Sequence, residues 1–329
     1  MKYIEFDNQL KASYSFALEE FIITDEQNNF DDDYLFIWNT NPTLMIGRFQ
    51  NPIEEVNYAY ATANRIPIVR RNSGGGTIYT DENCWQFSFI TKRNKQNINN
   101  FQIFTKPILY ILEKLGLTCS FSGRNDLLLN ERKFSGNAQF NLGSRCLHHG
   151  SILFDADLDK MNEALRVCTN KIFSKSVKSV KERVINIKPF LNNPDMTSEE
   201  FKNEMLNIIT KNMETISISK KHIPIIKKIE QTKFSTWEWN YGKSPEFDIT
   251  KRTTTIGGTI VVNLNVKDGL IIDCKVNGDF FFNGDIDDFT NSLVGCKYEK
   301  TAIHSQILET NYADSFHLVS VAELIDCFI

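Results

Sequence analysis

Apolar residues in the first hundred positions recur at two spacings, one typical of a helix and the other typical of a β-strand. Residues 13–26 carry apolar side chains at close to helical spacing, which predicts a helix. Two apolar runs, 34–38 and 43–46, are separated by an Asn-Pro pair and predict two strands with a turn. A further strand is predicted at 66–71. The segment 85–90 alternates apolar and polar residues, so that strand should bury one face.

The pattern continues with one clear helix and a group of strands. Residues 101–115 have apolar positions on one helical face, and Gly116 follows as a stop signal. Beyond it, short apolar stretches predict strands at 126–129, 133–140 and 148–154. The central part of the chain therefore mixes one helix with several strands.

The last third of the chain predicts a separate, smaller domain. Thr197-x-x-Glu200 is a capping box that should open a helix. Composition changes after residues 237–251, and alternating stretches on either side of 267–269 predict a hairpin with a Lys-Asp-Gly turn. The residues between this hairpin and residue 329 have a mostly helical pattern of apolar positions. We therefore expect a first domain over 1–245 and a small C-terminal domain over 246–329.

Composition and charge exclude several classes of protein. With 329 residues and 41% hydrophobic content, the chain can bury a large core. The 37 Lys and Arg against 41 Asp and Glu give a formal charge of −4, so no basic excess predicts nucleic-acid binding. No apolar run approaches the ~18 residues of a membrane span, and the N-terminus lacks the apolar segment of a signal peptide. Seven dispersed cysteines without a C-x-x-C pair indicate reduced thiols, so we expect a cytoplasmic protein.

A glycine triplet preceded by two arginines is the first candidate for chemistry. Gly74–Gly76 follow Arg70 and Arg71, and a bare backbone lets an anion approach its N–H groups. The triplet is neither a P-loop nor a dinucleotide fingerprint, since Tyr79 stands where the third glycine would be. Neighbouring strand residues face opposite ways, so one arginine should face a ligand and the other the scaffold. A hairpin turn is the alternative, but the guanidinium groups favour a carboxylate or phosphate site.

Lys133 is the second candidate. Small residues at 135–138 follow it and leave room for a bulky ligand beside the ammonium. Taken alone, a lysine such as Lys133 is more often a solvated surface residue than a site residue, and a carboxylate such as Asp126 more often lies at a strand end or in a turn.

The His148-His149-Gly150 triplet is the third candidate. The two histidines should point to opposite faces of a strand, so they cannot easily share one metal, and no nearby residue lies at zinc-ligand spacing. One of them should be structural. Gly150 would let a ligand lie against the backbone.

Taken together, these segments resemble the lipoate–protein ligase family. The matching stretches are RRNSGGGTIYTD, GRNDLL, KFSGNAQ and HHGSILFDADL, followed by SVKERVINI and WEWNYGKSPEFD. The resemblance covers nearly the whole chain, in order. It implies an α+β fold, with a catalytic domain of mixed sheets and helices related to biotin ligases and class II aminoacyl-tRNA synthetases. It also implies a small α+β C-terminal accessory domain.

The resemblance implies two half-reactions. ATP and lipoate, a substrate, would give lipoyl-AMP and pyrophosphate, with Mg²⁺ accompanying ATP. A lysine of an acceptor would then take the lipoyl group and release AMP. The implied acceptors are lipoyl domains of 2-oxoacid dehydrogenase acyltransferase subunits or the glycine cleavage H protein, without nucleic acid or membrane.

The resemblance also carries over individual residues. Lys133 would be catalytic, set against the lipoyl carbonyl and the phosphate. ATP would bind Arg71, Gly75, Gly76, Thr77, Ile78, Tyr79, Asn83, Asp126, Lys133 and Ala138. Lipoate would bind Arg70, Gly74, Gly75, Lys133, His149 and Gly150. No metal ligand is predicted. These residue types suit adenylation, because fixed cations and N–H donors can hold two negative groups together.

Departures from the family pattern keep other functions open. Thr80 stands where the family commonly has His, and Glu82-Asn83 where it commonly has Gly-Asn. A lipoyl or octanoyl transferase of the same fold would use a cysteine thioester and no ATP, which requires a thiol of low pKa. Cys84 and Cys146 lie near the motifs, but neither matches a catalytic position. A biotin ligase fits the arginine-glycine motif less well, and only Thr80 supports a binding protein with a degenerate site.

Overall fold

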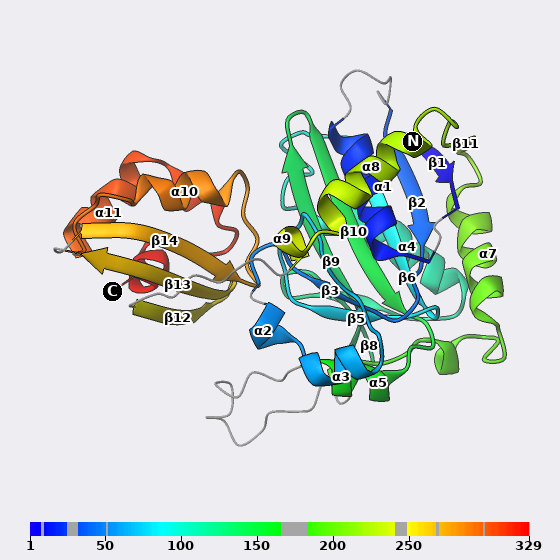
Figure 1. Cartoon of the computed structure of the whole chain (residues 1–329). Coiled ribbons are helices and arrows are strands. Elements are labelled where there is room, and N and C mark those ends of the chain that lie inside the picture. The colour runs from blue at the N-terminus through cyan, green and yellow to red at the C-terminus, as the bar shows by residue number, and fades with distance from the viewer. Residues whose placement is uncertain are drawn as a thin grey trace. The chain divides into compact units, whose positions relative to one another are not determined.

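The chain forms two compact units (Figure 1). The computed structural model describes residues 1–7, 10–24, 32–50, 52–165, 183–240, 249–267, 270–298 and 300–328. The larger unit comprises Met1–Ile46, Pro52–Arg71 and Thr77–Asn240, and the smaller one Gly47–Asn51, Asn72–Gly76 and Tyr241–Ile329. The glycine triplet thus belongs to the smaller unit. The expected boundary at 245–246 lies outside the described residues.

The larger unit is built on two sheets. Its strands are β1 (Lys2–Glu5), β2 (Tyr34–Trp38), β3 (Thr43–Ile46), β4 (Ile68–Arg70), β5 (Ile78–Thr80), β6 (Cys84–Lys92), β7 (Ser120–Ser122), β8 (Asp126–Leu129), β9 (Arg132–Leu142), β10 (Arg145–Leu153) and β11 (Glu214–Ser217). Eight of them form a sheet of order β11-β1-β2-β6-β10-β9-β8-β7, and three form a sheet of order β4-β3-β5. In the large sheet β1 pairs in parallel with β2 and β11, and the other neighbours are antiparallel.

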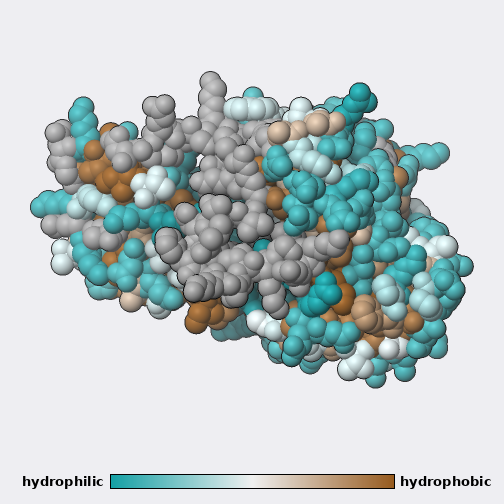
Figure 2. Space-filling view, turned by 90° about the horizontal axis from the view of Figure 1, so that it is seen from below, coloured by the Kyte–Doolittle hydropathy of each residue, from teal (hydrophilic) through white to brown (hydrophobic). Residues whose placement is uncertain are grey.

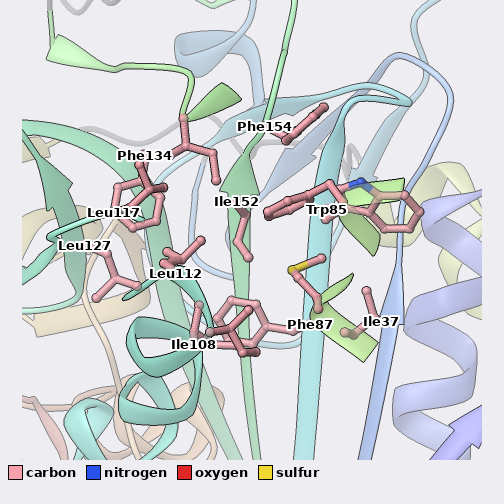
Figure 3. Packing of buried hydrophobic residues seen from close by; sticks show 14 of the residues in the cluster. Ile37, Trp85, Phe87, Ile108, Leu112, Leu117, Leu127, Phe134, Ile152 and Phe154 are labelled. Atoms are coloured by element: carbon pink, nitrogen blue, oxygen red, sulfur yellow. The ribbon is translucent and has the colours of Figure 1, made fainter. Parts of the chain in front are cut away.

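Helices cover both faces of the large sheet. The helical elements are α1 (Ala12–Thr24), α2 (Pro52–Glu55), α3 (Tyr58–Ala63), α4 (Phe101–Lys114), α5 (Leu158–Ala164), η2 (Lys188–Phe190), α7 (Ser198–Ile209), α8 (Ile223–Ile229), the π-helical η3 (Glu230–Phe234) and α9 (Trp237–Asn240). One core cluster joins α1 and α8 to the sheet, and a second joins α4 and α7 to its other face. Figure 3 shows the second cluster, with Phe87 of β6 beside Ile108 of α4.

Burial on both faces of the large sheet explains the sequence pattern of the central strands β2 and β6. The even residues of β2 pack under α1 and the odd ones toward α4, which accounts for its uninterrupted apolar run. The alternation in β6 predicted one buried face, but both faces are buried. Its polar residues are accommodated by hydrogen bonds: Gln86 Nε2 donates to Thr80 Oγ1 at 2.7 Å, and Ser88 Oγ donates to Glu19 Oε1 at 2.6 Å.

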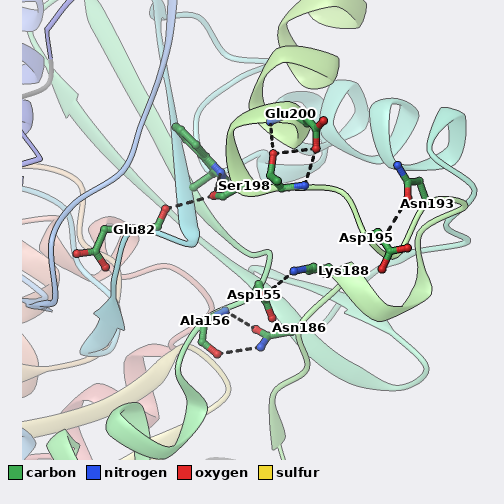
Figure 4. A network of polar contacts seen from close by, with 11 residues as sticks. Glu82, Asp155, Ala156, Asn186, Lys188, Asn193, Asp195, Ser198 and Glu200 are labelled. Atoms are coloured by element: carbon green, nitrogen blue, oxygen red, sulfur yellow. Dashed lines mark hydrogen bonds and ion pairs between the residues drawn. The ribbon is translucent and has the colours of Figure 1, made fainter.

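The predicted elements of this unit are confirmed, with one difference in pairing. Strands β2 and β3 have the predicted bounds, but they join different sheets and do not pair with each other. Helix α4 ends before Gly116, whose φ is +91°. The capping box at the start of α7 is present, with Thr197 and Glu200 hydrogen-bonded reciprocally (Figure 4).

The smaller unit combines a three-stranded antiparallel sheet with short helices. Its elements are β12 (Ile249–Thr255), β13 (Gly258–Lys267), β14 (Leu270–Gly278), α10 (Ile286–Ser292), α11 (Lys300–Glu309), η4 (Tyr312–Ser315) and α12 (Val321–Asp326). The predicted pairing of β13 with β14 is confirmed, while the turn residues Asp268 and Gly269 lie outside the described residues. An aromatic core that includes Phe280, Phe289 and Phe316 holds the helices on the sheet. Both units mix sheets with helices, which confirms the α+β class.

The described residues on the face seen in Figure 2 are mostly polar. In Figure 2 hydrophilic residues dominate the visible described face, and apolar residues gather in separate small patches. Within the described ranges, no helix is long and apolar enough to cross a bilayer.

Candidate functional site

Lys133 forms an ion pair with the other candidate of its motif. Its Nζ lies 2.8 Å from Asp126 Oδ1, and about a third of each side chain is exposed. The backbone of Lys133 is held on both sides, since it pairs with Leu128 of β8 and bridges to Val184. Ile185 N–H donates to Lys133 C=O at 2.9 Å. The described end of the SVKERVINI motif therefore fixes the strand that carries the lysine.

A β-bulge sets the direction of the Lys133 side chain. The register between β8 and β9 shifts so that Phe134 is an extra residue in β9. In a regular strand, residues 133 and 136 would face opposite sides. With the bulge between them they share a side, and a Cβ at Gly136 would lie 3.0 Å from Lys133 Nζ. The small residues after the lysine thus make room for the lysine itself.

His149 belongs to a buried polar cluster under α1. Its Nδ1 lies 2.9 Å from Glu19 Oε1, which also accepts from Ser88 Oγ, and Trp38 Nε1 donates to Ser88 Oγ at 3.0 Å. Glu19 is only 1% exposed. A buried carboxylate requires such partners, because an ion removed from water without them is strongly destabilised.

Both arginines of the glycine motif are buried and bound to main-chain carbonyls. Arg70 Nε donates to Trp239 C=O at 2.9 Å and Nη2 to Asn240 C=O at 3.2 Å. Arg71 Nη1 donates to Met45 C=O at 3.1 Å. Burial lowers the pKa of Arg71 to about 10, and the negative charge of Glu19 opposes that shift. Arg71 therefore remains a cation at neutral pH.

A reciprocal contact fixes the backbone of Arg70. Arg70 N–H donates to Asn240 Oδ1 at 2.8 Å, and Trp239 Nε1 donates to Arg70 C=O at 2.8 Å. Asn240 Nδ2 in turn donates to Phe234 C=O at the end of the π-helical turn η3. The α8–η3–α9 segment therefore holds β4 at Arg70.

The residues after the glycine triplet form the edge strand β5. Ile78 pairs with Met45 and Tyr79 with Leu44 of β3, while Thr77 directly precedes the strand. The Tyr79 ring is buried, and burial raises the pKa of its hydroxyl. Only the backbone of Tyr79 is therefore suited to contact a nucleotide. Thr80 is fully buried and accepts a hydrogen bond from Gln86.

The three glycines of the triplet differ from one another. A Cβ at Gly74 would lie 2.3 Å from Phe280 C=O, so packing within the smaller unit requires glycine there. Gly75 has φ +91°, and its N–H points at Phe280 C=O at 3.4 Å. Gly76 is exposed, and apart from its two chain neighbours no heavy atom of the described residues lies within 4 Å of the position its Cβ would take. Gly76 is thus the member of the triplet whose Cβ position is not filled by a described residue.

The remaining candidates lie on the large sheet or beside it. Ala138 is the register partner of His149 on β9. A Cβ at Gly150 would lie 2.3 Å from both Asn137 Oδ1 and Phe87 Cζ, so the space beside this glycine is filled by the protein. Asn83 N–H donates to Asp81 Oδ1 at 3.0 Å, and its C=O accepts from Phe154 and Asp155.

The structure thus brings the predicted residues together in distinct groups. Lys133 and Asp126 form one group, and Ala138 and His149 form a second. In the third group, Arg70 lies on β4 and Ile78 and Tyr79 lie on β5, the two strands that flank β3. Sequence reasoning missed Glu19 and Asn240. Glu19 had a signal, since it lies between Phe16 and Ile22 on the apolar face of a helix, and Asn240 lies within the stretch WEWNYGKSPEFD that carries the resemblance.

Cys84 and Cys146 lack the environment of a nucleophile. Both are fully buried. Burial raises the pKa of the Cys84 thiol well above its usual value, with Asp81 adding to the effect, and burial raises the pKa of Cys146 to about 12. A catalytic thiol needs the opposite shift.

Two further features of the described residues bear on ligands. Within the described ranges, no group of three or more His, Cys, Asp and Glu side chains could hold a metal ion. A surface cavity of about 520 Å³ lies beside α4 and includes Ile103, Phe104 and Pro107 in its wall, but none of the predicted site residues lines it. We therefore do not identify it with the substrate site.

Comparison with known proteins defines the class. The model of the lipoyl protein ligase A/B catalytic domain matches residues 11–210, and that of the bacterial lipoate protein ligase C-terminus matches 244–328. Lipoate-protein ligase LplJ of Bacillus subtilis is 37% identical over 99% of both chains, and lipoate–protein ligase 1 of Staphylococcus aureus is 36% identical over 99% of both. The chain belongs to the lipoate–protein ligase family.

Solved structures agree with this assignment. P. falciparum LipL1 in complex with lipoate superimposes with a TM-score of 0.78, covering 95% of this chain and 97% of that one at 23% identity, which supports the fold. An archaeal bipartite lipoate protein ligase, described together with its E2 lipoyl domain from Thermoplasma acidophilum, matches at 26% identity with a TM-score of 0.65. That match covers 75% of this chain and 98% of the archaeal one.

Proposed function

We propose that this chain is an ATP-dependent lipoate–protein ligase. In the first half-reaction, a carboxylate oxygen of lipoate bonds to the α-phosphorus of ATP, the bond from that phosphorus to the bridging oxygen breaks, and pyrophosphate leaves. In the second, the amine of an acceptor lysine bonds to the lipoyl carbonyl carbon and loses a proton, and AMP leaves. Family membership over the full length supports this reaction.

The ion pair of Lys133 with Asp126 is the observation that carries the proposal. The bulged strand holds the lysine backbone on both edges, and the ammonium lies 2.8 Å from the Asp126 carboxylate. Such a preorganised cation can stabilise charge as it moves from the carboxylate to the adenylate, and a single donor of this kind typically contributes ~3 kcal/mol. Lys133 would contact the lipoyl carbonyl oxygen and the α-phosphate.

The other predicted residues complete the two binding sites. ATP would lie along the backbone of Gly75 to Tyr79, with Arg71, Asn83, Asp126 and Ala138 around it. Lipoate would lie near Arg70, Gly74, His149 and the backbone of Gly150, and the neighbouring apolar strands would enclose its tail. The buried positive charge of Arg71 supports a site that attracts an anion.

Mg²⁺ would enter with ATP. Mg²⁺ is commonly held by one or two carboxylates together with substrate phosphates, so a dedicated protein cage is not required. Asp126 could supply such a carboxylate through its Oδ2, since its Oδ1 contacts the Lys133 ammonium.

The proposal also covers the acceptor proteins and the division of the chain into domains. Lipoyl domains of 2-oxoacid dehydrogenase acyltransferase subunits or the glycine cleavage H protein would be the acceptors, in the cytoplasm. Residues 1–245 would form the catalytic domain and 246–329 the accessory domain, as the two family models suggest. The buried, high-pKa thiols of Cys84 and Cys146 disfavour transfer through a cysteine thioester.

Single-turnover formation of lipoyl-AMP tests the proposal. Pyrophosphate should be released only when lipoate and ATP are both present. Lys133→Ala should slow this step by about 10²- to 10³-fold. Lys133→Arg should also fail, because its planar fork is larger than the compact ammonium. Lys188→Ala is the matched control, since Lys188 also forms a 2.8 Å ion pair, with Asp155, at similar exposure (Figure 4). A normal rate in folded Lys133→Ala protein, or acyl transfer without ATP, would refute the proposal.

A further inference from the structure

His148 is a buried titratable residue that the proposed reaction does not use. It points away from His149, toward α4, and is completely buried. Its ring stacks on Phe104 at 4.6 Å, and Phe101 contacts it edge-on at 5.5 Å. Burial lowers the pKa of His148 well below its usual value, and His149 adds to that shift. The imidazole is therefore neutral at physiological pH.

The contacts of Gln139 determine the role of Nδ1 in this ring. Gln139 Oε1 accepts from Asn99 N–H at 2.8 Å, which identifies the other end of the amide as Nε2. Gln139 Nε2 donates to Asn97 C=O and lies 3.3 Å from His148 Nδ1. Because an amide NH₂ only donates, Nδ1 must accept.

The contacts of Asn137 determine the role of Nε2 in the same way. Asn137 Nδ2 donates to Asn125 C=O at 3.1 Å and to Ser135 Oγ at 3.2 Å, so its Oδ1 is the acceptor that faces the ring. His148 Nε2 lies 3.2 Å from this oxygen and must carry the proton. One neutral tautomer satisfies both ends, while a second proton on Nδ1 would face the Gln139 NH₂ group.

Asn137 connects this ring to the strand pair that holds Lys133. Besides the side-chain bond, Asn137 N–H donates to Asn125 C=O at 3.0 Å and Asn125 Nδ2 donates to Asn137 C=O at 2.7 Å. Asn125 directly precedes Asp126, whose carboxylate lies 2.8 Å from Lys133 Nζ. Three hydrogen bonds thus lock β9 to the start of β8 next to this ion pair.

We propose that His148 is a positioning residue for Lys133, acting through Asn137 and Asn125. The ordered chain Gln139–His148–Asn137–Asn125 holds the start of β8 in register, so that Asp126 meets the ammonium at a fixed point. Gly150 is required for the same hydrogen-bonded chain, because any side chain at this position would displace Asn137 Oδ1. This inference rests on the proposed role of Lys133.

Two substitutions separate positioning from packing. His148→Phe keeps a ring against Phe104 but removes both hydrogen bonds, whereas His148→Gln retains an N–H donor near Nε2. We expect His148→Phe to slow lipoyl-AMP formation roughly ten- to hundredfold, as for a displacement of up to 1 Å in an active site. His148→Gln should recover most of that loss. Cys146→Ala, fully buried on the same strand, is the control and should keep the wild-type rate.

A double-mutant cycle with Lys133→Ala decides the question. If His148 acts through Lys133, His148→Phe should change the residual rate of Lys133→Ala protein by less than about twofold. An equal effect in both backgrounds, or a normal rate in folded His148→Phe protein, would overturn the inference alone. A normal rate in Lys133→Ala protein would overturn the proposed function as well. The cycle is repeated with Asn125→Ala, a half-buried turn position, so a poorly folded His148→Phe protein does not leave the question open.

Discussion

Gly136→Ala is a test of how closely the protein controls the Lys133 ammonium. The added Cβ would lie 3.0 Å from Nζ and 3.1 Å from Cε of Lys133, both inside ordinary van der Waals contact. Both atoms belong to the flexible end of a side chain, so the lysine can retreat while the strand stays in place. The retreat must lengthen or redirect the 2.8 Å contact with Asp126, because that contact lies in the same narrow space.

The size of the effect follows from this geometry. A displacement of several tenths of an ångström should slow lipoyl-AMP formation about tenfold, given that 1 Å can cost about a hundredfold. The free energy of unfolding should change by less than about 1 kcal/mol, because no backbone atom is overlapped. The assay pairs single-turnover adenylate formation with urea unfolding. A wild-type rate in this variant, or a rate loss that persists undiminished in a Lys133→Ala background, would contradict the reasoning.

Four further substitutions address the two thiols, the arginine contact and the buried carboxylate. Cys84→Ala and Cys146→Ala should keep ligation. In the wild-type protein both of these thiols should resist iodoacetamide at pH 8, because burial raises the pKa of each, and at a pKa of about 12 the Cys146 thiol is ionised to only about one part in 10⁴. Rapid modification of Cys84 or Cys146, located by peptide mass spectrometry in folded protein, would contradict this. Trp239→Phe removes the hydrogen-bond donor to Arg70 C=O. The Kd for lipoate, measured by calorimetry, should rise about fivefold, as for one lost hydrogen bond. An unchanged Kd would show that this contact does not contribute to lipoate binding. Glu19→Gln removes the negative charge beside a buried arginine, so urea unfolding should show a loss of about 1–3 kcal/mol; unchanged stability would mean that the charge is not needed.

The strongly patterned elements of this fold could be predicted from local sequence, but their partners could not. The runs that became β2 and β3 have the predicted bounds because uninterrupted apolar residues can only be buried. Their assignment to different sheets depends on β6, β4 and β5, which come later in the chain. The short strands β1 and β11 pair across about two hundred residues, and nothing within either segment specifies the other.

In the candidate site, too, the sequence predicted which residues matter but not how their side chains are arranged. Lys133 and Asp126 were both named from their motifs, and the structure places them in contact. The bulge that turns the lysine was not predictable, because it arises from the register between two strands. The two histidines face opposite sides as strand geometry requires. Which of them joins Glu19 depends on where α1 packs.

Gly136 and Gly150 both leave space that a polar side chain of the protein occupies. Glycine beside candidate catalytic residues usually indicates space for a ligand. Here the space at Gly136 is occupied by Lys133, and the space at Gly150 by the Asn137 amide. Both are polar groups of the protein, held before substrate arrives, and such preorganised groups need no rearrangement when charge develops. Enlarging either glycine should therefore lower the rate of adenylation more than the affinity for lipoate. A ligand-contact role would give the reverse order, so rate and affinity measured on one variant separate the two roles.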